Sequence, residues 1–245
     1  MTIRDLANML EDARHAVALT GAGVSTESGI PDFRSDAGLW KDADPMQVSS
    51  IQGFEEDPDR FYAFWKDKFA SLVSAAPNDA HRLLAGLESR GRMAAVITQN
   101  IDGLHQRAGS HNVLEVHGSF RTVRCLACGH ASTIEALFQR EVGEAARCPS
   151  CGEKRVKPDV VLFGEMLTAA FGEAQVAARE ADVLIAMGTS LGVYPVAGLV
   201  GEAQQNGARV VIINRDETPF DDDADFVLHG ELGPTSRELM TLLGM

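Results

Sequence analysis

The sequence predicts an α/β fold: a doubly wound, parallel, Rossmann-like sheet with a smaller inserted domain made of a helical module and a four-cysteine zinc module. Three observations support this prediction. Continuous apolar runs recur along the chain, helical patterns lie between several of them, and two long stretches interrupt the alternation. Because helices cover both faces of a parallel sheet, its strands are apolar throughout instead of alternating with polar residues.

The first predicted element is an amphipathic helix from Thr2 to about Ala13, because Leu6, Met9 and Leu10 recur at helical spacing. An apolar strand follows and leads directly into a glycine-rich loop. Further apolar runs predict buried strands later in the chain. The predicted strands cover residues 16–19, 94–97, 113–116, 183–186, 210–213 and 226–228.

Helices are predicted between several of these strands. Asn78 is a suitable N-cap for a helix that carries three leucines and ends near Gly91. Pro195 can open another helix that ends near Gly207, since proline is favoured at the first helical position. Strands that alternate with helices in this way indicate a doubly wound sheet.

Two stretches lack this alternation and predict a second, smaller domain. Residues 32–78 are rich in Asp, Phe and Trp and show no strand signal, while residues 121–158 contain all four cysteines. We expect these two insertions to form one helical and zinc-binding domain. The Rossmann-like domain then consists of residues 1–31, 79–120 and 159–245.

Composition and charge limit the classes of partner. The chain has 245 residues and a net charge of -13, which would repel nucleic acid and attract lysine-bearing peptides. The acidity could equally serve only to keep the protein soluble. No apolar run approaches the roughly 20 residues that span a membrane, and the N-terminus lacks an apolar signal core. We therefore predict a cytoplasmic protein with neither a membrane nor a nucleic acid as partner.

The four cysteines form two Cys-x-x-Cys pairs separated by 19 residues. Two such pairs supply four thiolates to one tetrahedral Zn²⁺, and a site filled by four cysteines is structural because a catalytic zinc keeps an open position. Two disulfides are the alternative, but they are disfavoured in a cytosolic protein, whose thiols are kept reduced. A free-standing zinc ribbon for nucleic acid is a further alternative, against which the acidity and the large α/β body argue. The predicted zinc ligands are Cys125, Cys128, Cys148 and Cys151.

The glycine-rich loop at residues 21–29 follows a predicted strand. Its glycines would let backbone amides approach a pyrophosphate. However, Thr26 stands where the usual dinucleotide pattern has its third glycine, and no strand-end acid follows about 20 residues later. An ordinary hydride-transfer dehydrogenase is therefore disfavoured, and a plain strand-to-helix turn explains the loop equally well.

Polar residues follow four of the predicted strands, at the edge where open α/β sheets bind ligands. Together they predict one ligand-binding crevice, made by residues 98–102, 117–119, 188–190 and 214–216. Among them His117 is a candidate general base, since Asn100 and Asp102 leave a neighbouring strand end. A satisfied structural histidine is the alternative there. The other six histidines are interpreted as structural or surface residues.

Six segments and the two cysteine pairs, in the same order along nearly the whole chain, resemble the sirtuin family. The matching segments are GAGVSTESGIPDFRS (21–35), TQNIDGLHQRAGS (98–110), EVHGS (115–119), the two cysteine pairs, KPDVVLFGE (157–165), GTSLGVYP (188–195) and INRDETPFD (213–221). Sirtuins couple lysine deacylation to cleavage of NAD, with a histidine as base toward the ribose hydroxyls. The resemblance implies that this chain converts acetyl-lysine and NAD to lysine, nicotinamide and O-acetyl-ADP-ribose.

The same resemblance implies roles for individual residues. His117 matches the base, Asn100 would order ribose and water, and Asp102 with Ile101 would hold the nicotinamide amide. Expected NAD contacts are Gly21, Ala22, Gly23, Thr26, Asp32, Phe33, Arg34, Gln99, Asn100, Ile101, Asp102, His117, Gly188, Thr189, Ser190, Asn214 and Arg215. Expected contacts to an acetyl-lysine peptide are Val160, Val161, Phe163, Gly164, Glu165 and Val193. Backbone pairing along this edge would accept many peptide sequences.

One departure from a sirtuin branch bears on the acyl group. The branch that prefers succinyl or malonyl lysine carries Tyr-x-x-Arg in the helical insertion, whereas the corresponding place here reads Tyr62-Ala-Phe-Trp65. An apolar pocket does not stabilise a buried carboxylate. We therefore expect acetyl and longer apolar acyl groups. ADP-ribosyl transfer to protein and a non-catalytic zinc and nucleotide-binding module remain alternatives. Because sirtuins of this short length are often monomeric, the resemblance also implies a monomer.

Overall fold

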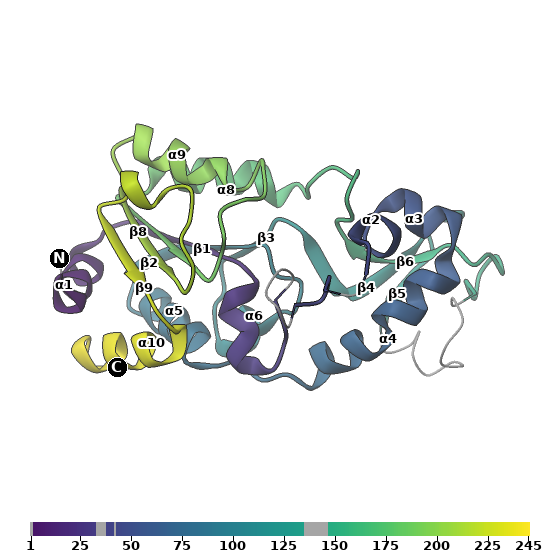
Figure 1. The fold of residues 1–245 in the computed structure, drawn as a ribbon, viewed down its shortest axis with the longest axis horizontal. Helices are drawn as coiled ribbons and strands as arrows, with labels where there is room; N and C mark the ends of the chain where they lie inside the picture. The colour runs from purple at the N-terminus through teal and green to yellow at the C-terminus, as the bar shows by residue number, and fades with distance from the viewer. Residues whose placement is uncertain (1, 33–37, 42, 135–146) are drawn as a thin grey trace.

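A computed structural model describes residues 2–32, 38–41, 43–134 and 147–245. Figure 1 shows two parts side by side: a large sheet with helices on both faces, and a smaller sheet flanked by the helices of residues 45–74. The chain passes between the two parts several times. The predicted α/β class with a smaller module beside a parallel sheet is confirmed.

The large sheet has six strands in the order β3-β2-β1-β7-β8-β9, and all of its neighbouring strands are parallel. Strand order reverses between β1 and β7, which creates a switch point at the carboxyl edge of the sheet. The two strands at this point are completely buried, in agreement with their uninterrupted apolar sequences. The strands are β1 (Ala16–Thr20), β2 (Met93–Thr98), β3 (Val113–Glu115), β7 (Val183–Met187), β8 (Arg209–Asn214) and β9 (Phe226–His229).

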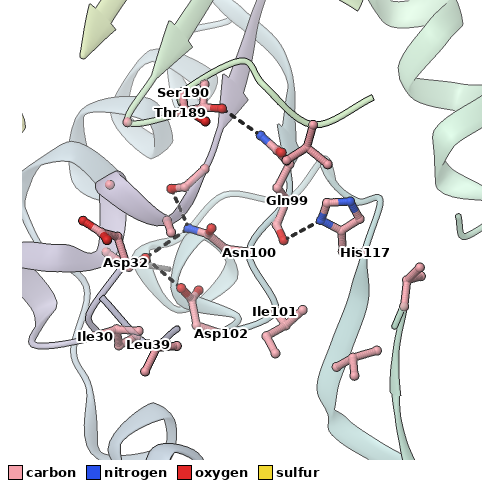
Figure 2. Close-up of a pocket in the computed structure, with 18 of the residues that line it drawn as sticks. Ile30, Asp32, Leu39, Gln99, Asn100, Ile101, Asp102, His117, Thr189 and Ser190 are labelled. Carbon is pink, nitrogen blue, oxygen red and sulfur yellow. Dashed lines mark hydrogen bonds between the residues drawn. The ribbon is translucent and has the colours of Figure 1, made fainter. Parts of the chain in front are cut away.

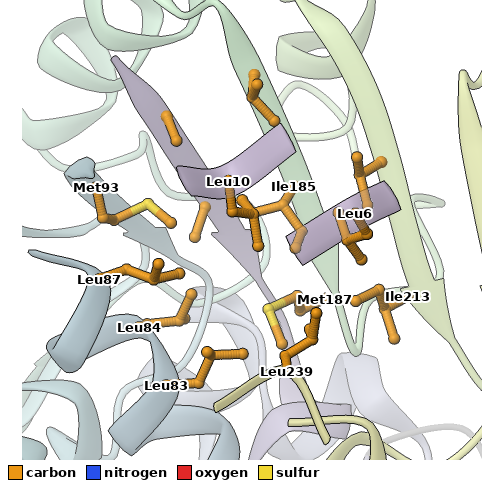
Figure 3. Close-up of a cluster of buried hydrophobic side chains, with 14 of the residues drawn as sticks. Leu6, Leu10, Leu83, Leu84, Leu87, Met93, Ile185, Met187, Ile213 and Leu239 are labelled. Atoms are coloured by element: carbon orange, nitrogen blue, oxygen red, sulfur yellow. The ribbon is translucent and has the colours of Figure 1, made fainter. Parts of the chain in front are cut away.

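Helices cover both faces of this sheet. On one face α1 (Ile3–Asp12), α5 (Asp79–Ser89) and α10 (Leu232–Leu242) pack against strand residues such as Ile185, as Figure 3 shows. On the other face lie α8 (Ala170–Glu180) and α9 (Gly198–Gln205). Three shorter elements complete this part: η1 (Ala22–Ser28), α6 (Leu104–Ala108) and η2 (Asp221–Asp223).

The smaller sheet is antiparallel, in the order β5-β4-β6, with β4 (Gly118–Cys125), β5 (Ala131–Thr133) and β6 (Val156–Val160). Against it pack α3 (Ile51–Glu56) and α4 (Pro58–Ser74) through an aromatic core that includes Phe61, Phe69 and Phe120. The short α2 (Pro45–Val48) packs on α3 and α4. The domain boundaries proposed from the sequence, at 120/121 and 158/159, fall inside β4 and β6. The division into two domains stays a prediction.

The predicted N-cap of α5 and the predicted start of the first helix are close to those of the structure, whereas the predicted start of α9 is wrong. Thr2 caps α1 with a reciprocal bond from Asp5, and Asn78 caps α5 by accepting a hydrogen bond from the Ala80 amide. Pro195 does not open α9. Pro195 lies in a turn, where its carbonyl accepts a hydrogen bond from the Gly198 amide. The helix therefore begins three residues later than predicted. Among the described residues, no helix is long and apolar enough to cross a membrane.

Candidate active site

A cavity of about 1410 Å³ lies between the carboxyl edge of the large sheet and the small module. Its wall on the sheet side consists of the loops that follow β1, β2, β7 and β8, which are the strands on either side of the switch point. The position agrees with the predicted crevice. Figure 2 shows the side chains of Gln99, Asn100 and His117 converging on it.

The loop after β1 packs tightly against the loop after β7. The Gly23 amide donates to the Gly188 carbonyl at 2.9 Å, and a Cβ atom on Gly23 would lie 2.8 Å from the Gly188 Cα. A Cβ atom on Gly21 would lie equally close, 2.8 Å, to the Cβ of Thr189. The two glycines are therefore required by the approach of two loops, which is a structural reason that the sequence pattern did not reveal.

A hydrogen-bonded group of buried polar side chains forms the floor of the cavity. Asn100 Nδ2 donates to the Gly21 carbonyl at 3.0 Å and lies 3.1 Å from Ser25 Oγ. The Ser25 hydroxyl in turn donates to Asp102 Oδ2 at 2.7 Å. Ser25 thus links the two residues predicted from the strand end. The sequence analysis missed it, although it stands within the glycine-rich loop.

Asp102 is 5% exposed, and burial raises the pKa of its carboxyl group. Two hydrogen bonds oppose this shift, one from the Leu104 amide to Oδ1 at 2.9 Å and one from Ser25. Both carboxylate oxygens therefore have a donor within the protein. The side chain is held in one orientation at the cavity wall.

The His117 ring is oriented by a backbone contact. Its Nδ1 lies 3.1 Å from the carbonyl oxygen of Gln99, and burial lowers the pKa of the ring. A carbonyl only accepts hydrogen bonds, so Nδ1 carries the proton in the neutral ring and Nε2 keeps its lone pair. The geometry presents a neutral imidazole whose free nitrogen can act as a base.

Two further histidines lie behind the floor, where the sequence analysis expected structural roles. His81 Nε2 is 3.5 Å from Ser25 Oγ, and His105 Nε2 is 3.0 Å from Thr20 Oγ1. Their ring centroids are 4.8 Å apart. Burial lowers the pKa of His81 to about 4 and that of His105 to about 3, so both rings are neutral at physiological pH.

The small module supplies an aromatic and apolar wall. Trp40 packs on Phe163 with ring centroids 5.6 Å apart, and the Trp65 indole donates to the Val48 carbonyl at 2.6 Å. Tyr62 does not line the cavity, because its hydroxyl donates to the Val156 carbonyl inside the small module. Further along α4, Lys68 also lines the cavity.

Lys68 is a cation on this wall that the sequence analysis did not single out. Its Nζ donates to the Phe64 carbonyl at 2.9 Å and lies 3.7 Å from the centroid of the Phe64 ring. Partial burial lowers the pKa of the ammonium group, although the neighbouring Asp67 carboxylate opposes this shift. Within the Tyr62-x-x-Trp65 segment, Trp65 is the residue that lines the cavity.

Residues 160–165 form one rim of the cavity. The Val161 amide donates to the His117 carbonyl at 2.8 Å, and Phe163 exchanges backbone hydrogen bonds with the segment of Ser49 and Ile51. The rim is thus bonded both to the residue that presents the imidazole and to the small module. Val193, from the loop after β7, also lines the cavity.

The structure brings together all the predicted cofactor and peptide residues that it describes. Phe33 and Arg34 lie outside the described residues. The predicted residues that line the cavity are Gly21, Ala22, Gly23, Thr26, Asp32, Gln99, Asn100, Ile101, Asp102, His117, Val160, Val161, Phe163, Gly164, Glu165, Gly188, Thr189, Ser190, Val193, Asn214 and Arg215.

The four cysteines converge at the end of the small sheet. Their sulfur atoms all lie within 4.8 Å of one another, with Cys125 3.7 Å from Cys151 and Cys128 3.6 Å from Cys148. A disulfide would require about 2.05 Å. Tetrahedral Zn–S bonds of about 2.3 Å place sulfurs about 3.8 Å apart, so the donor set fits a structural zinc. None of the four lines the cavity.

Comparisons with known proteins agree on one family. The Sir2 family pattern matches residues 21–195. The NAD-dependent protein deacetylase of Caldivirga maquilingensis is 47% identical over 229 residues, which are 92% of this chain and 88% of that protein.

Solved structures of Sir2 proteins have the same fold. One, bound to a deacetylated p53 peptide and 3'-O-acetyl-ADP-ribose, superposes with a TM-score of 0.95 at 39% identity and covers 100% of both chains. Another, bound to a p53 peptide and NAD, gives a TM-score of 0.90 at 38% identity and covers 100% of this chain and 99% of that one.

Proposed function

Because this chain belongs to the Sir2 family, we propose that it is an NAD-dependent protein-lysine deacetylase. The products are lysine, nicotinamide and O-acetyl-ADP-ribose. The observation that carries the proposal is the His117 imidazole, neutral and fixed by the Gln99 carbonyl, beside the hydrogen-bonded Asn100, Ser25 and Asp102.

The sheet side of the cavity is the proposed NAD site. When bound, NAD supplies the ribose carbon that accepts the acetyl oxygen, with nicotinamide as the leaving group. The loop of Gly21, Ala22 and Thr26 borders the space for the phosphates, and Thr189, Ser190 and Asn214 border that for the adenosine half. Asn100 and Asp102 would hold the ribose and the nicotinamide amide.

The Asp102 carboxylate has donors on both oxygens from within the protein, so its orientation is fixed before ligand binds. Such preorganisation reduces the cost of positioning a reactant. His117 Nε2 would take the proton from a ribose hydroxyl. Because burial lowers the pKa of His117, the ring is in its basic form at neutral pH.

The rim of residues 160–165, with Val193, is the proposed edge for an extended acetyl-lysine peptide. Backbone pairing there would give affinity with little sequence demand. The wall of Leu39, Trp65 and Phe163 suits an acetyl group, because each presents apolar surface to the cavity. The zinc would stabilise the fold of the small module without taking part in the reaction.

The remaining proposals concern partners and location. A net charge of -13 disfavours direct binding to nucleic acid and favours lysine-rich peptides. We propose a monomer that acts in the cytoplasm. Sedimentation of the purified protein would test the monomeric state, which a stable dimer would contradict.

Incubation with NAD and an acetyl-lysine peptide tests the reaction. We expect the intact protein to release nicotinamide and deacetylated peptide, and His117→Ala to form deacetylated peptide 10²–10⁴-fold more slowly, the range that loss of a general base produces. Full activity of His117→Ala would overturn the assignment. NAD labelled in the ADP-ribose part distinguishes the alternative of ADP-ribosyl transfer, which would leave the label on the acceptor protein.

A further inference from the structure

The segment that carries the peptide edge contains a buried ion pair. Lys157 in β6 is 6% exposed, and its Nζ lies 3.0 Å from the carboxylate of Glu165. We propose that this pair is a latch that shapes the peptide edge, so that both residues position the substrate peptide without Lys157 touching it. The inference rests on the proposed function.

The ammonium group of Lys157 is satisfied entirely by this segment. Nζ donates to the Val160 carbonyl at 2.6 Å and to the Pro158 carbonyl at 3.1 Å, in addition to the ion pair. Three acceptors match the three hydrogens of an ammonium group. Lys157 itself does not line the cavity.

Glu165 closes the other end of the segment. Its Oε2 accepts from the Leu162 amide at 2.8 Å, and the Glu165 amide donates to the Leu162 carbonyl at 3.0 Å. The carboxylate is thus committed to the backbone and to Lys157. Glu165 was expected as a peptide contact, and the geometry assigns it the role of holding the edge in shape.

The latched segment touches the catalytic side of the cavity through its backbone. Val160 pairs with Gly118, and the Val161 amide donates to the carbonyl of His117. A side chain on Gly118 would collide with the Asp159 carbonyl, so the two backbones are in close contact. A shift of the segment would displace the peptide edge first and His117 through this contact.

The NAD side of the cavity has a separate framework. Its loops are held by contacts such as those of Gly23 with Gly188 and of Gln99 with Thr20. Neither contact involves residues 157–165. Loss of the latch should therefore weaken peptide binding and leave NAD binding intact, a pattern that general loss of stability would not produce.

Lys157→Met removes the donors while keeping a chain of similar length, and Glu165→Gln removes the charge while keeping an acceptor for Leu162. We expect Lys157→Met to raise KM for an acetyl-lysine peptide about tenfold or more, because it leaves the Glu165 charge unpaired, and Glu165→Gln to raise it less. KM for NAD should stay within about twofold. Lys157→Arg, which keeps charge and donors, should recover part of the peptide affinity.

The partly exposed ion pair of Lys154 with Asp59, at 3.0 Å, provides a matched control in the same module. Lys154→Met should leave both KM values unchanged. An unchanged peptide KM in Glu165→Gln, or equal rises in both KM values, would overturn the latch. If the unmodified protein releases no nicotinamide, the proposed function fails instead. If Lys157→Met does not fold, the peptide KM of Glu165→Gln alone tests the role of the ion pair.

Discussion

At the scale of single residues, the environment of His117 predicts the pH dependence of the reaction. The base must be neutral to accept a proton, so activity falls as pH decreases through its pKa. Burial, the largest influence, lowers this pKa below the ordinary value of about 6.5, although the bond to the Gln99 carbonyl partly opposes the shift.

We therefore expect kcat/KM for an acetyl-lysine peptide to fall with decreasing pH. The midpoint of this fall should lie below about pH 6.5. The measurement uses a peptide without other groups that titrate between pH 5 and 8. A midpoint at or above the ordinary histidine value would contradict the assignment of the buried ring as the base.

Ser25 is the residue that joins Asn100 to Asp102, which gives a second prediction. Ser25→Ala removes the donor to a buried carboxylate and the acceptor for Asn100 Nδ2. Each unsatisfied buried group costs about 1–3 kcal/mol, so the free energy of unfolding should fall by that order. Nicotinamide release should slow as well.

Ser71→Ala is the control for this change, because Ser71 also lines the cavity but donates only to a carbonyl of its own helix. Thermal unfolding and turnover of the two variants should differ clearly. Equal behaviour of both would show that the Ser25 hydrogen bonds contribute little.

At the scale of elements, the sequence predicts strands better than loops. The apolar runs predict the positions of the buried strands because strands covered on both faces are mostly apolar. The short β3 ends at Glu115, before the predicted Val116, since Val116 already lies in the turn toward His117.

The α4 helix shows why some of the site escapes sequence analysis. Which of its side chains faces the cavity depends on how the helix packs on the small sheet. Tyr62 and Trp65 are both buried, yet only Trp65 reaches the cavity wall. No local pattern distinguishes them, because both faces of this part of α4 carry aromatic residues.

The cysteine cluster gives a prediction for the small module. We expect one Zn²⁺ per chain by elemental analysis, and Cys148→Ser should lower that content because a three-cysteine site binds zinc less tightly. Chelation should destabilise the small sheet before the large one, which hydrogen exchange would resolve. Protein purified without zinc, yet stable and resistant to chelators, would contradict a structural site.

At the scale of the whole molecule, the doubly wound sheet was predictable because its strands and helices alternate along the chain. The convergence of the four strand-end loops follows from the switch point between β1 and β7. The contacts across the cavity were not predictable from spacing. The Ser25–Asp102 bond and the position of Lys68 at the cavity depend on elements distant in sequence, while the ion pair of Lys157 with Glu165 depends on the fold of one short segment.

We infer that acetyl transfer is coupled to NAD cleavage in one cavity and that the zinc lies outside it. The most direct measurement is the stoichiometry of products from an acetyl-lysine peptide and NAD, followed by mass spectrometry. We predict equal amounts of nicotinamide, deacetylated peptide and O-acetyl-ADP-ribose. Free acetate formed without consumption of NAD would contradict the coupling of deacetylation to NAD cleavage.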